Sequence, residues 1–192
     1  KVRESVNASS PLIVGTQVYI AECYGPGGVL LDLLPDGSCQ KVWSHDLLNT
    51  HFMTAVHKDG YLYGIAGHGP GRAPLVCIDL RTGEQMWRTV PKWDETVQTR
   101  TGARKYTIGT ALASMILVDG RCLLLGQYGH LLWLDLNPKE YRQLDRVRLF
   151  LARQTWSMPA LSPGLLYVCQ NDRAVDGTQP RLICYDLRGR RE

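Results

Sequence analysis

The sequence predicts an all-β fold built from repeated antiparallel sheets, and three observations lead to this expectation. First, Asp59–Gly64 and Pro74–Trp87 form a pattern of strand, loop and strand that recurs in Pro163–Cys169 and Arg181–Gly189. Second, no segment keeps its apolar residues at a helical spacing. Third, 19 glycines and 10 prolines interrupt the apolar runs before a helix could propagate. A stacked repeat of this kind is typical of a β-propeller.

A turn glycine precedes an apolar strand four times, at separations of 45, 60 and 44 residues. These glycines are Gly15, Gly60, Gly120 and Gly164. Propeller blades have about 40 to 50 residues. We therefore expect one domain over residues 1–192, with four blade repeats of four antiparallel strands. The repeats are expected at about 8–45, 51–90, 108–150 and 155–192.

A second anchor is an apolar strand that closes on an aspartate, at Asp79, Asp135 and Asp186, whereas the first repeat has Leu33 there. Carboxylates at such positions accept hydrogen bonds from turn amides, so we interpret these residues as structural.

The second repeat shows the expected strands most clearly. They are Met53–His57, Tyr61–Ile65, Leu75–Leu80 and Gln85–Arg88. The inner strands are nearly continuous apolar runs, which is typical of strands covered on both faces.

The last repeat reaches Glu192 without a fourth strand. We expect a strand from outside that repeat to complete it. We also expect the chain to be the C-terminal part of a larger propeller, because four blades alone would leave sheet edges uncovered. The missing blades would come from upstream sequence or from another chain.

The segment from Cys77 to Trp87 resembles the Ala-x-Asp-x-x-Thr-Gly-x-x-x-Trp repeat of the pyrroloquinoline-quinone-like (PQQ-like, quinoprotein-type) propeller family, with cysteine in the alanine position. The resemblance implies a tryptophan packed between blades. The family includes quinoprotein alcohol dehydrogenases and non-enzymatic members such as the propeller lipoprotein of the outer-membrane β-barrel assembly machine. A WD40 interpretation would rest on Gly67-His68 and Trp93-Asp94 alone, a pair that occurs once.

Composition is ordinary for a globular domain, with 44% hydrophobic and 21% charged residues. The net charge of +4 is too small and too scattered to favour nucleic-acid binding. No run of 18 apolar residues predicts a transmembrane segment.

The sequence predicts no catalytic residue and no metal site. Its six cysteines include no CxxC and no adjacent pair, so they are interpreted as buried thiols. Quinone-dependent members of the resembled family carry an adjacent Cys-Cys pair, so no cofactor is predicted and PQQ remains only an implication of the resemblance. The carboxylates Asp94, Glu95, Asp172 and Asp176 are expected in separate loops, too far apart to gather around one cation.

Connections alternate between the two rims of a propeller, and the longer ones are expected to share one rim. Binding is usually carried by long loops on a rigid scaffold. The candidate binding face on this rim consists of His51, His68, Trp93, His130 and Trp156. The longest insert, Thr89–Thr107, is expected to be a mobile or partner-ordered loop over the channel mouth.

These observations favour a non-catalytic scaffold or binding module for a protein, peptide or polysaccharide partner. The alternative is part of a PQQ-dependent or related oxidoreductase whose site residues lie in missing blades. The family resemblance alone implies export to a bacterial periplasm or cell surface.

Overall fold

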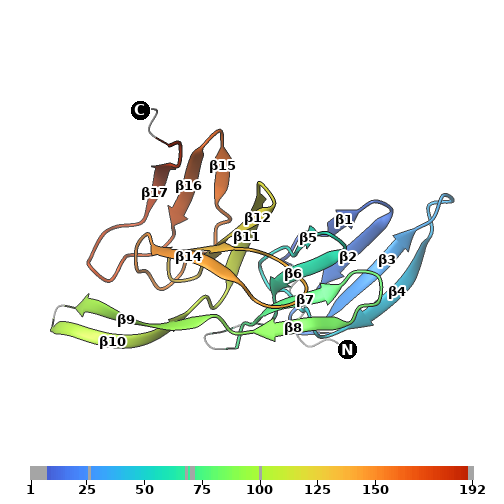
Figure 1. Cartoon of the computed structure of the whole chain (residues 1–192), viewed down its shortest axis with the longest axis horizontal. Coiled ribbons are helices and arrows are strands. Elements are labelled where there is room, and N and C mark those ends of the chain that lie inside the picture. Colours follow the sequence, from blue (N-terminus) through green and yellow to red (C-terminus); the bar gives the residue numbers. More distant parts are fainter. Residues whose placement is uncertain (1–7, 26, 68, 70–71, 100, 190–192) are drawn as a thin grey trace.

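The computed structural model describes residues 8–25, 27–67, 69, 72–99 and 101–189, and in these ranges the chain forms strands and no helix. The strands form four radial sheets and one separate hairpin (Figure 1). Each sheet is antiparallel with its strands in chain order. The predicted all-β propeller architecture is confirmed, and we call the four sheets blades 1 to 4.

The bounds of the strands follow. Blade 1 holds β1 (Leu12–Val14), β2 (Gln17–Ala21), β3 (Gly28–Leu33) and β4 (Cys39–His45). Blade 2 holds β5 (Val56–Lys58), β6 (Tyr61–Ile65), β7 (Leu75–Asp79) and β8 (Gln85–Thr89). Blade 3 holds β11 (Ala113–Val118), β12 (Arg121–Gly126), β13 (His130–Leu134) and β14 (Gln143–Arg148). Blade 4 holds β15 (Ala160–Ser162), β16 (Leu165–Gln170) and β17 (Arg181–Asp186). The hairpin consists of β9 (Lys92–Thr99) and β10 (Gly102–Gly109).

The predicted first strand of blade 2, Met53–His57, is wrong by several residues, because β5 begins at Val56. Met53 is buried, and its sulfur accepts a hydrogen bond of 2.8 Å from Ser114 Oγ in blade 3. This segment is therefore held by the neighbouring blade instead of by pairing with β6.

Alternate side chains of one strand face two different neighbouring blades. In β6, Leu62 packs in the apolar cluster shared with blade 1, whereas Tyr63 packs in the cluster shared with blade 3. In β7, Val76 joins the first cluster and Cys77 the second. Burial of one such side chain contributes roughly 1.5–3 kcal/mol, so a central blade is stabilised from both sides. The predicted coverage of both faces is confirmed for blades 2 and 3.

Indole rings connect successive blades, as the sequence resemblance implied. Trp43 Nε1 donates a hydrogen bond of 2.8 Å to the carbonyl of Leu80 in blade 2, and Trp87 Nε1 donates one of 2.9 Å to the carbonyl of Asn137 in blade 3. Gly83 lies under the Trp43 ring at a φ of +76°, and a Cβ there would approach the ring to 2.9 Å. The residue of β14 that corresponds to Trp43 and Trp87 is Asp145. Strand β14 therefore supplies no tryptophan to connect blade 3 with blade 4.

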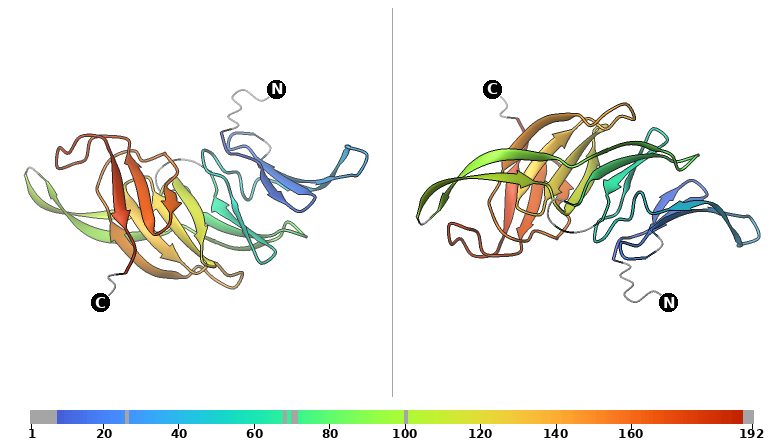
Figure 2. Two further views of the ribbon diagram at one scale, coloured as in Figure 1. Left: turned by 90° about the horizontal axis from the view of Figure 1, so that it is seen from above. Right: turned by 90° about the horizontal axis from the view of Figure 1, so that it is seen from below.

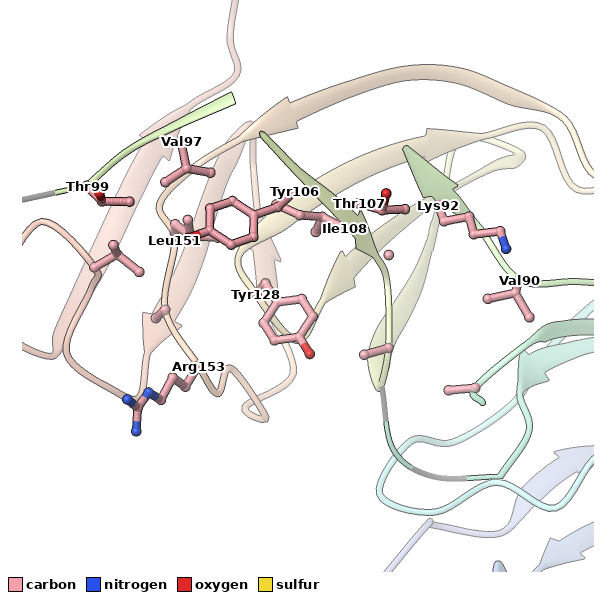
Figure 3. Close-up of a pocket in the computed structure, with 15 residues that line it drawn as sticks. Val90, Lys92, Val97, Thr99, Tyr106, Thr107, Ile108, Tyr128, Leu151 and Arg153 are labelled. Atoms are coloured by element: carbon pink, nitrogen blue, oxygen red, sulfur yellow. The ribbon is translucent and has the colours of Figure 1, made fainter. Parts of the chain in front are cut away.

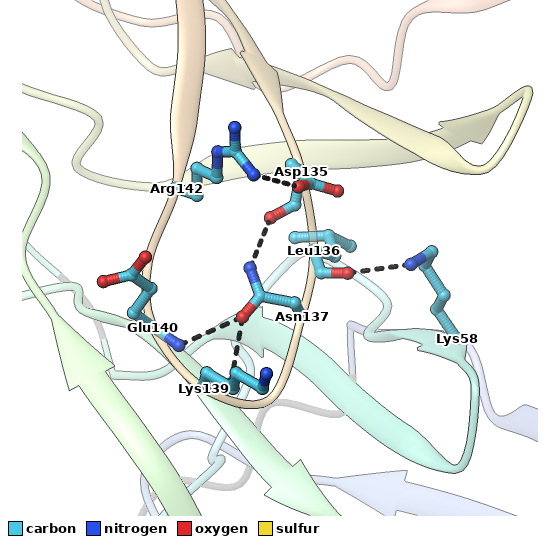
Figure 4. A network of polar contacts seen from close by, with 7 residues as sticks. All are labelled: Lys58, Asp135, Leu136, Asn137, Lys139, Glu140 and Arg142. Carbon is cyan, nitrogen blue, oxygen red and sulfur yellow. Dashed lines mark hydrogen bonds and ion pairs between the residues drawn. The ribbon is translucent and has the colours of Figure 1, made fainter.

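The turn of blade 3 that receives Trp87 is itself held by side chains (Figure 4). Asn137 Oδ1 accepts hydrogen bonds from the backbone amides of Lys139 and Glu140, and Lys58 Nζ donates to the carbonyl of Leu136 at 2.8 Å. In blade 2, Asp79 Oδ1 accepts from the amides of Arg81 and Thr82, both at 2.9 Å. The predicted structural role of this aspartate is confirmed.

The outer faces of blades 1 and 4 remain apolar and exposed. Ile13 of blade 1 is 68% exposed and Leu182 of blade 4 is 67% exposed. Cys184 is exposed as well, because no described residue covers that face, and Cys39 on β4 is also exposed. The interpretation of the cysteines as buried thiols was therefore wrong for Cys39 and Cys184. Within the described residues β17 pairs only with β16, and completion of blade 4 by a strand from elsewhere stays a prediction.

We expect Trp87→Ala to lower the free energy of unfolding by about 3 kcal/mol, because it removes a large ring from the packing between two blades. Trp87→Phe keeps most of the ring and loses the bond to Asn137, which should cost about 1 kcal/mol. Urea denaturation measures both values.

The matched control is Met86→Ala, since Met86 is adjacent on the same strand and 42% exposed. It should change stability by less than about 0.5 kcal/mol. Equal losses for Met86→Ala and Trp87→Ala would contradict the interblade role of the indole.

Candidate binding surface at the loop-rich rim

Thr89–Thr107 was expected to be a mobile or partner-ordered loop, and the expectation of a loop is wrong, because the described residues of this segment lie mainly in the β9–β10 hairpin. The two strands pair without interruption from Lys92↔Gly109 to Thr99↔Gly102. Side chains at every second position of β9 face the blades, and Val97 among them is buried. Charged residues occupy the intervening positions of β9, so this alternation was not recognised in the sequence. The hairpin extends along blades 3 and 4 (Figures 1 and 2).

Glu95 on β9 fixes the hairpin to blade 3. Its Oε2 lies 2.7 Å from His130 Nε2 and accepts a hydrogen bond of 3.1 Å from Trp93 Nε1, while its Oε1 forms an ion pair with Arg148. The Trp93 ring meets the His130 ring edge-on at 5.0 Å, and the guanidinium of Arg146 lies 4.2 Å from the Trp93 ring centroid. We call these five residues the hairpin anchor.

The electrostatics of the anchor favour a neutral imidazole. Burial lowers the pKa of His130 below its ordinary value; the hydrogen bond to Glu95 opposes this shift, and the charges of Arg148 and Arg146 reinforce it. His130 Nδ1 is buried without a hydrogen-bond partner among the described residues. A second proton would leave a buried donor unpaired, so we assign the tautomer that carries its proton on Nε2 and donates it to Glu95.

Glu95 is held as a carboxylate. Burial acts to raise its pKa, but the hydrogen bonds from Trp93 and His130 and the charge of Arg148 outweigh that effect and lower it. The expectation that Asp94 and Glu95 lie in loops is wrong, because both lie on β9. Asp94, the next residue, is exposed on the opposite face of β9, where it pairs with Lys105 at 2.9 Å.

Hydrogen bonds join the loops of this rim to the crossings between blades. Asn49 in the first crossing donates to the carbonyl of Cys23 and accepts from the amide of Gly67. In blade 4, Asn171 Oδ1 accepts from the amides of Trp156 and Ser157, at 2.9 and 3.2 Å. The predicted placement of these loops on a common rim is consistent with such bonds.

Four rings form a continuous aromatic series on the rim. The Tyr24 ring lies 5.1 Å from His51, His51 lies 3.9 Å from Phe52, and Phe52 lies 5.0 Å from Trp156. Tyr24 and Trp156 at the two ends are 42% and 41% exposed, whereas His51 is buried. We call these residues the aromatic ladder.

The five candidates of the sequence analysis thus fall into two groups. Trp93 and His130 meet in the hairpin anchor, and His51 and Trp156 belong to the aromatic ladder. His68 lies outside the described residues. Sequence reasoning missed the linking residues, Glu95 and Phe52. The alternation Trp93, Glu95, Val97 was the available signal for Glu95, whereas nothing in the sequence indicated the position of Phe52.

The described residues contain no group of three histidine, cysteine, aspartate or glutamate side chains able to hold a metal ion. All six cysteines are unpaired as disulfides, and Cys77 and Cys122 are buried. Within the described ranges there is no helix of sufficient length and apolarity to cross a membrane.

Comparisons with known proteins support the fold. No family model and no curated protein matches the chain. Among solved structures, BamB from Moraxella catarrhalis aligns at a TM-score of 0.58 and 13% identity over 94% of this chain and 43% of its own. A europium-containing methanol dehydrogenase aligns at 0.52 and 12% identity, with 94% and 43% covered. The quinohemoprotein alcohol dehydrogenase ADHIIG from Pseudomonas putida HK5 aligns at 0.52 and 15% identity, with 95% and 33% covered.

These structures are PQQ-like propeller proteins, as the sequence resemblance predicted. Identities this low show a common fold and nothing finer. The chain spans less than half the length of each of the three proteins.

We expect Glu95→Gln to accelerate amide hydrogen exchange in β9 and β10 by about tenfold, because charge-assisted hydrogen bonds are worth roughly 1.5–3 kcal/mol. Asp94→Asn is the matched control, since it removes the adjacent carboxylate on the opposite face. The anchor role would be refuted if both variants, followed by mass spectrometry, loosened the hairpin to the same degree.

Acid should weaken the anchor. Both pKa shifts are downward, so the unfolded chain binds protons more readily, and stability is lost as pH falls. The loss should begin below about pH 6.5 for His130 and below about 4.5 for Glu95, their ordinary values. Urea titrations at pH 8, 6, 5 and 4 on the wild type and His130→Gln measure this loss of stability. The wild type should lose more stability between pH 8 and 5 than the variant, and parallel curves would contradict this assignment.

Proposed function

We propose that this chain is a non-catalytic binding module of a β-propeller and that its loop-rich rim docks a protein or peptide partner. The aromatic ladder carries this proposal. Two exposed aromatic side chains flank the buried His51 ring and the partly buried Phe52 ring on a rigid rim, an arrangement that resembles the aromatic hot spots of protein interfaces.

The ladder is ordered before any partner binds. Asn171 Oδ1 accepts hydrogen bonds from the backbone amides of both Trp156 and Ser157, and the Phe52 ring packs against the indole. Met158, two residues further along, is 52% exposed. A surface that is already ordered loses little conformational entropy on binding, which favours a docking role.

The exposed outer faces of blades 1 and 4 are proposed to pack against further blades of the same propeller. Their exposed apolar side chains, such as Ile13 and Leu182, match the residue types that fill the interfaces between the central blades. Those blades would come from upstream sequence or from another chain.

The alternative function is a part of a PQQ-dependent oxidoreductase. The observation in its favour is the fold shared with a methanol dehydrogenase and a quinohemoprotein alcohol dehydrogenase. Its site residues would lie in blades beyond this chain. The same resemblance supports a proposed location in a bacterial periplasm or on a bacterial cell surface.

Site-specific photo-crosslinking in the intact protein tests the binding role. A photoreactive amino acid at position 156 should give one discrete protein adduct in the native host, whereas the same amino acid at position 86, on an exposed strand position away from the ladder, should give none. Phe52→Ala should reduce the adduct at position 156 by roughly tenfold, because hot-spot rings dominate binding energy.

Three results would oppose the proposal. Adducts of equal yield at both positions would indicate non-specific contact. Retention by an immobilised polysaccharide, lost in Trp156→Ala, would assign the ladder to a glycan. PQQ-dependent reduction of a dye by the intact protein would favour the oxidoreductase alternative.

A further inference from the structure

A cavity of about 670 Å³ lies between the hairpin and the loop-rich rim (Figure 3). Val97 and Ile108 of the hairpin line one side, and Leu151 and Ala152, from the crossing between blades 3 and 4, line the other. Its volume is within the range of small-molecule sites, about 300–1,000 Å³. It does not include any residue of the aromatic ladder.

The walls of the cavity are apolar with a few polar groups at defined places. The rings of Tyr106 and Tyr128 lie between Lys92 and Arg153 in Figure 3. Neither tyrosine hydroxyl has a hydrogen-bond partner among the described residues. An apolar cavity with a small number of convergent polar groups is the usual form of a ligand site.

The charged side chains among the described residues that line the cavity are all basic. Lys92 and Arg153 both line the cavity, and its described lining residues include no aspartate or glutamate. Neither basic side chain forms an ion pair within the part of the chain that the structure describes. Lys105 on the same hairpin differs, because it is neutralised by Asp94 at 2.9 Å. The two cations of the cavity are therefore available to an anionic ligand.

From this geometry we propose that the cavity binds an amphipathic organic anion, with an apolar body against Val97, Ile108 and Leu151 and its anionic group on Lys92 or Arg153. The tyrosine rings offer flat apolar surface to the body and hydroxyl donors to the acidic group. Burial of the apolar body removes apolar surface from water, which favours binding. The anionic group gains a charge-assisted hydrogen bond to a cation that forms no other ion pair within the described residues.

A pair of fluorescent probes separates the two parts of this proposal. 8-Anilinonaphthalene-1-sulfonate is an apolar anion, and N-phenyl-1-naphthylamine is the same ring system without the sulfonate. The double variant Lys92→Gln/Arg153→Gln should weaken binding of the sulfonate about tenfold, because it removes charge-assisted hydrogen bonds. Binding of the neutral probe should change less than about twofold.

Two further variants locate the bound probe. Val175→Trp places a ring into the cavity from a side chain that is 49% exposed, and it should weaken both probes. Lys105→Gln is the matched charge control and should leave both affinities unchanged. Circular dichroism spectra confirm that each variant is folded.

The proposal fails if Val175→Trp and the double variant both bind the sulfonate as tightly as the wild type does. It also fails if Ile13→Asp, on the exposed face of blade 1, is the change that abolishes binding, since the probe would then report that sheet face. These outcomes are independent of the aromatic ladder, so they leave the proposed partner-binding role untouched.

Discussion

Apolar packing between neighbouring blades is the constraint on which the rest of the structure depends. The inner strands of a central blade present successive side chains to two different neighbours, so Leu62 and Tyr63 belong to separate clusters although they are adjacent. Trp43 and Trp87 add a directed hydrogen bond to this packing, each reaching a carbonyl of the next blade. The stability of a blade is thus largely a nearest-neighbour property, as in other repeat architectures.

The rim inherits its order from this stacking. Because the blades are fixed relative to one another, loops and crossings from different repeats can be joined by single side chains such as Asn49 and Asn171. The hairpin is then held above blade 3 by one carboxylate, Glu95, which gathers partners from β9, β13 and β14. The same rim therefore carries an exposed aromatic ladder and, beneath the hairpin, a separate apolar cavity that two basic side chains also line.

The sequence predicted those features that repeat. The glycine spacing, the continuous apolar strands and the segment Cys77–Trp87 were sufficient for the propeller, its sheets and the interblade tryptophan. The hairpin was not predicted, because it occurs once and its inward positions include Glu95, which breaks the apolar alternation. Contacts such as Phe52 with Trp156 depend on how two crossings far apart in sequence are placed by the blades. Local sequence patterns do not encode that placement.

Native-state hydrogen exchange resolved by strand tests the central claim most directly. The account predicts the highest protection in β6, β7, β12 and β13, whose two faces are both covered, with exchange only through global unfolding. Strands β2, β3, β16 and β17 of the outer blades should exchange faster through local opening, since one face of each blade lacks a neighbour in this chain. Equal protection across all four blades of the 192-residue chain, or greater protection in the outer two, would contradict stabilisation by neighbouring blades.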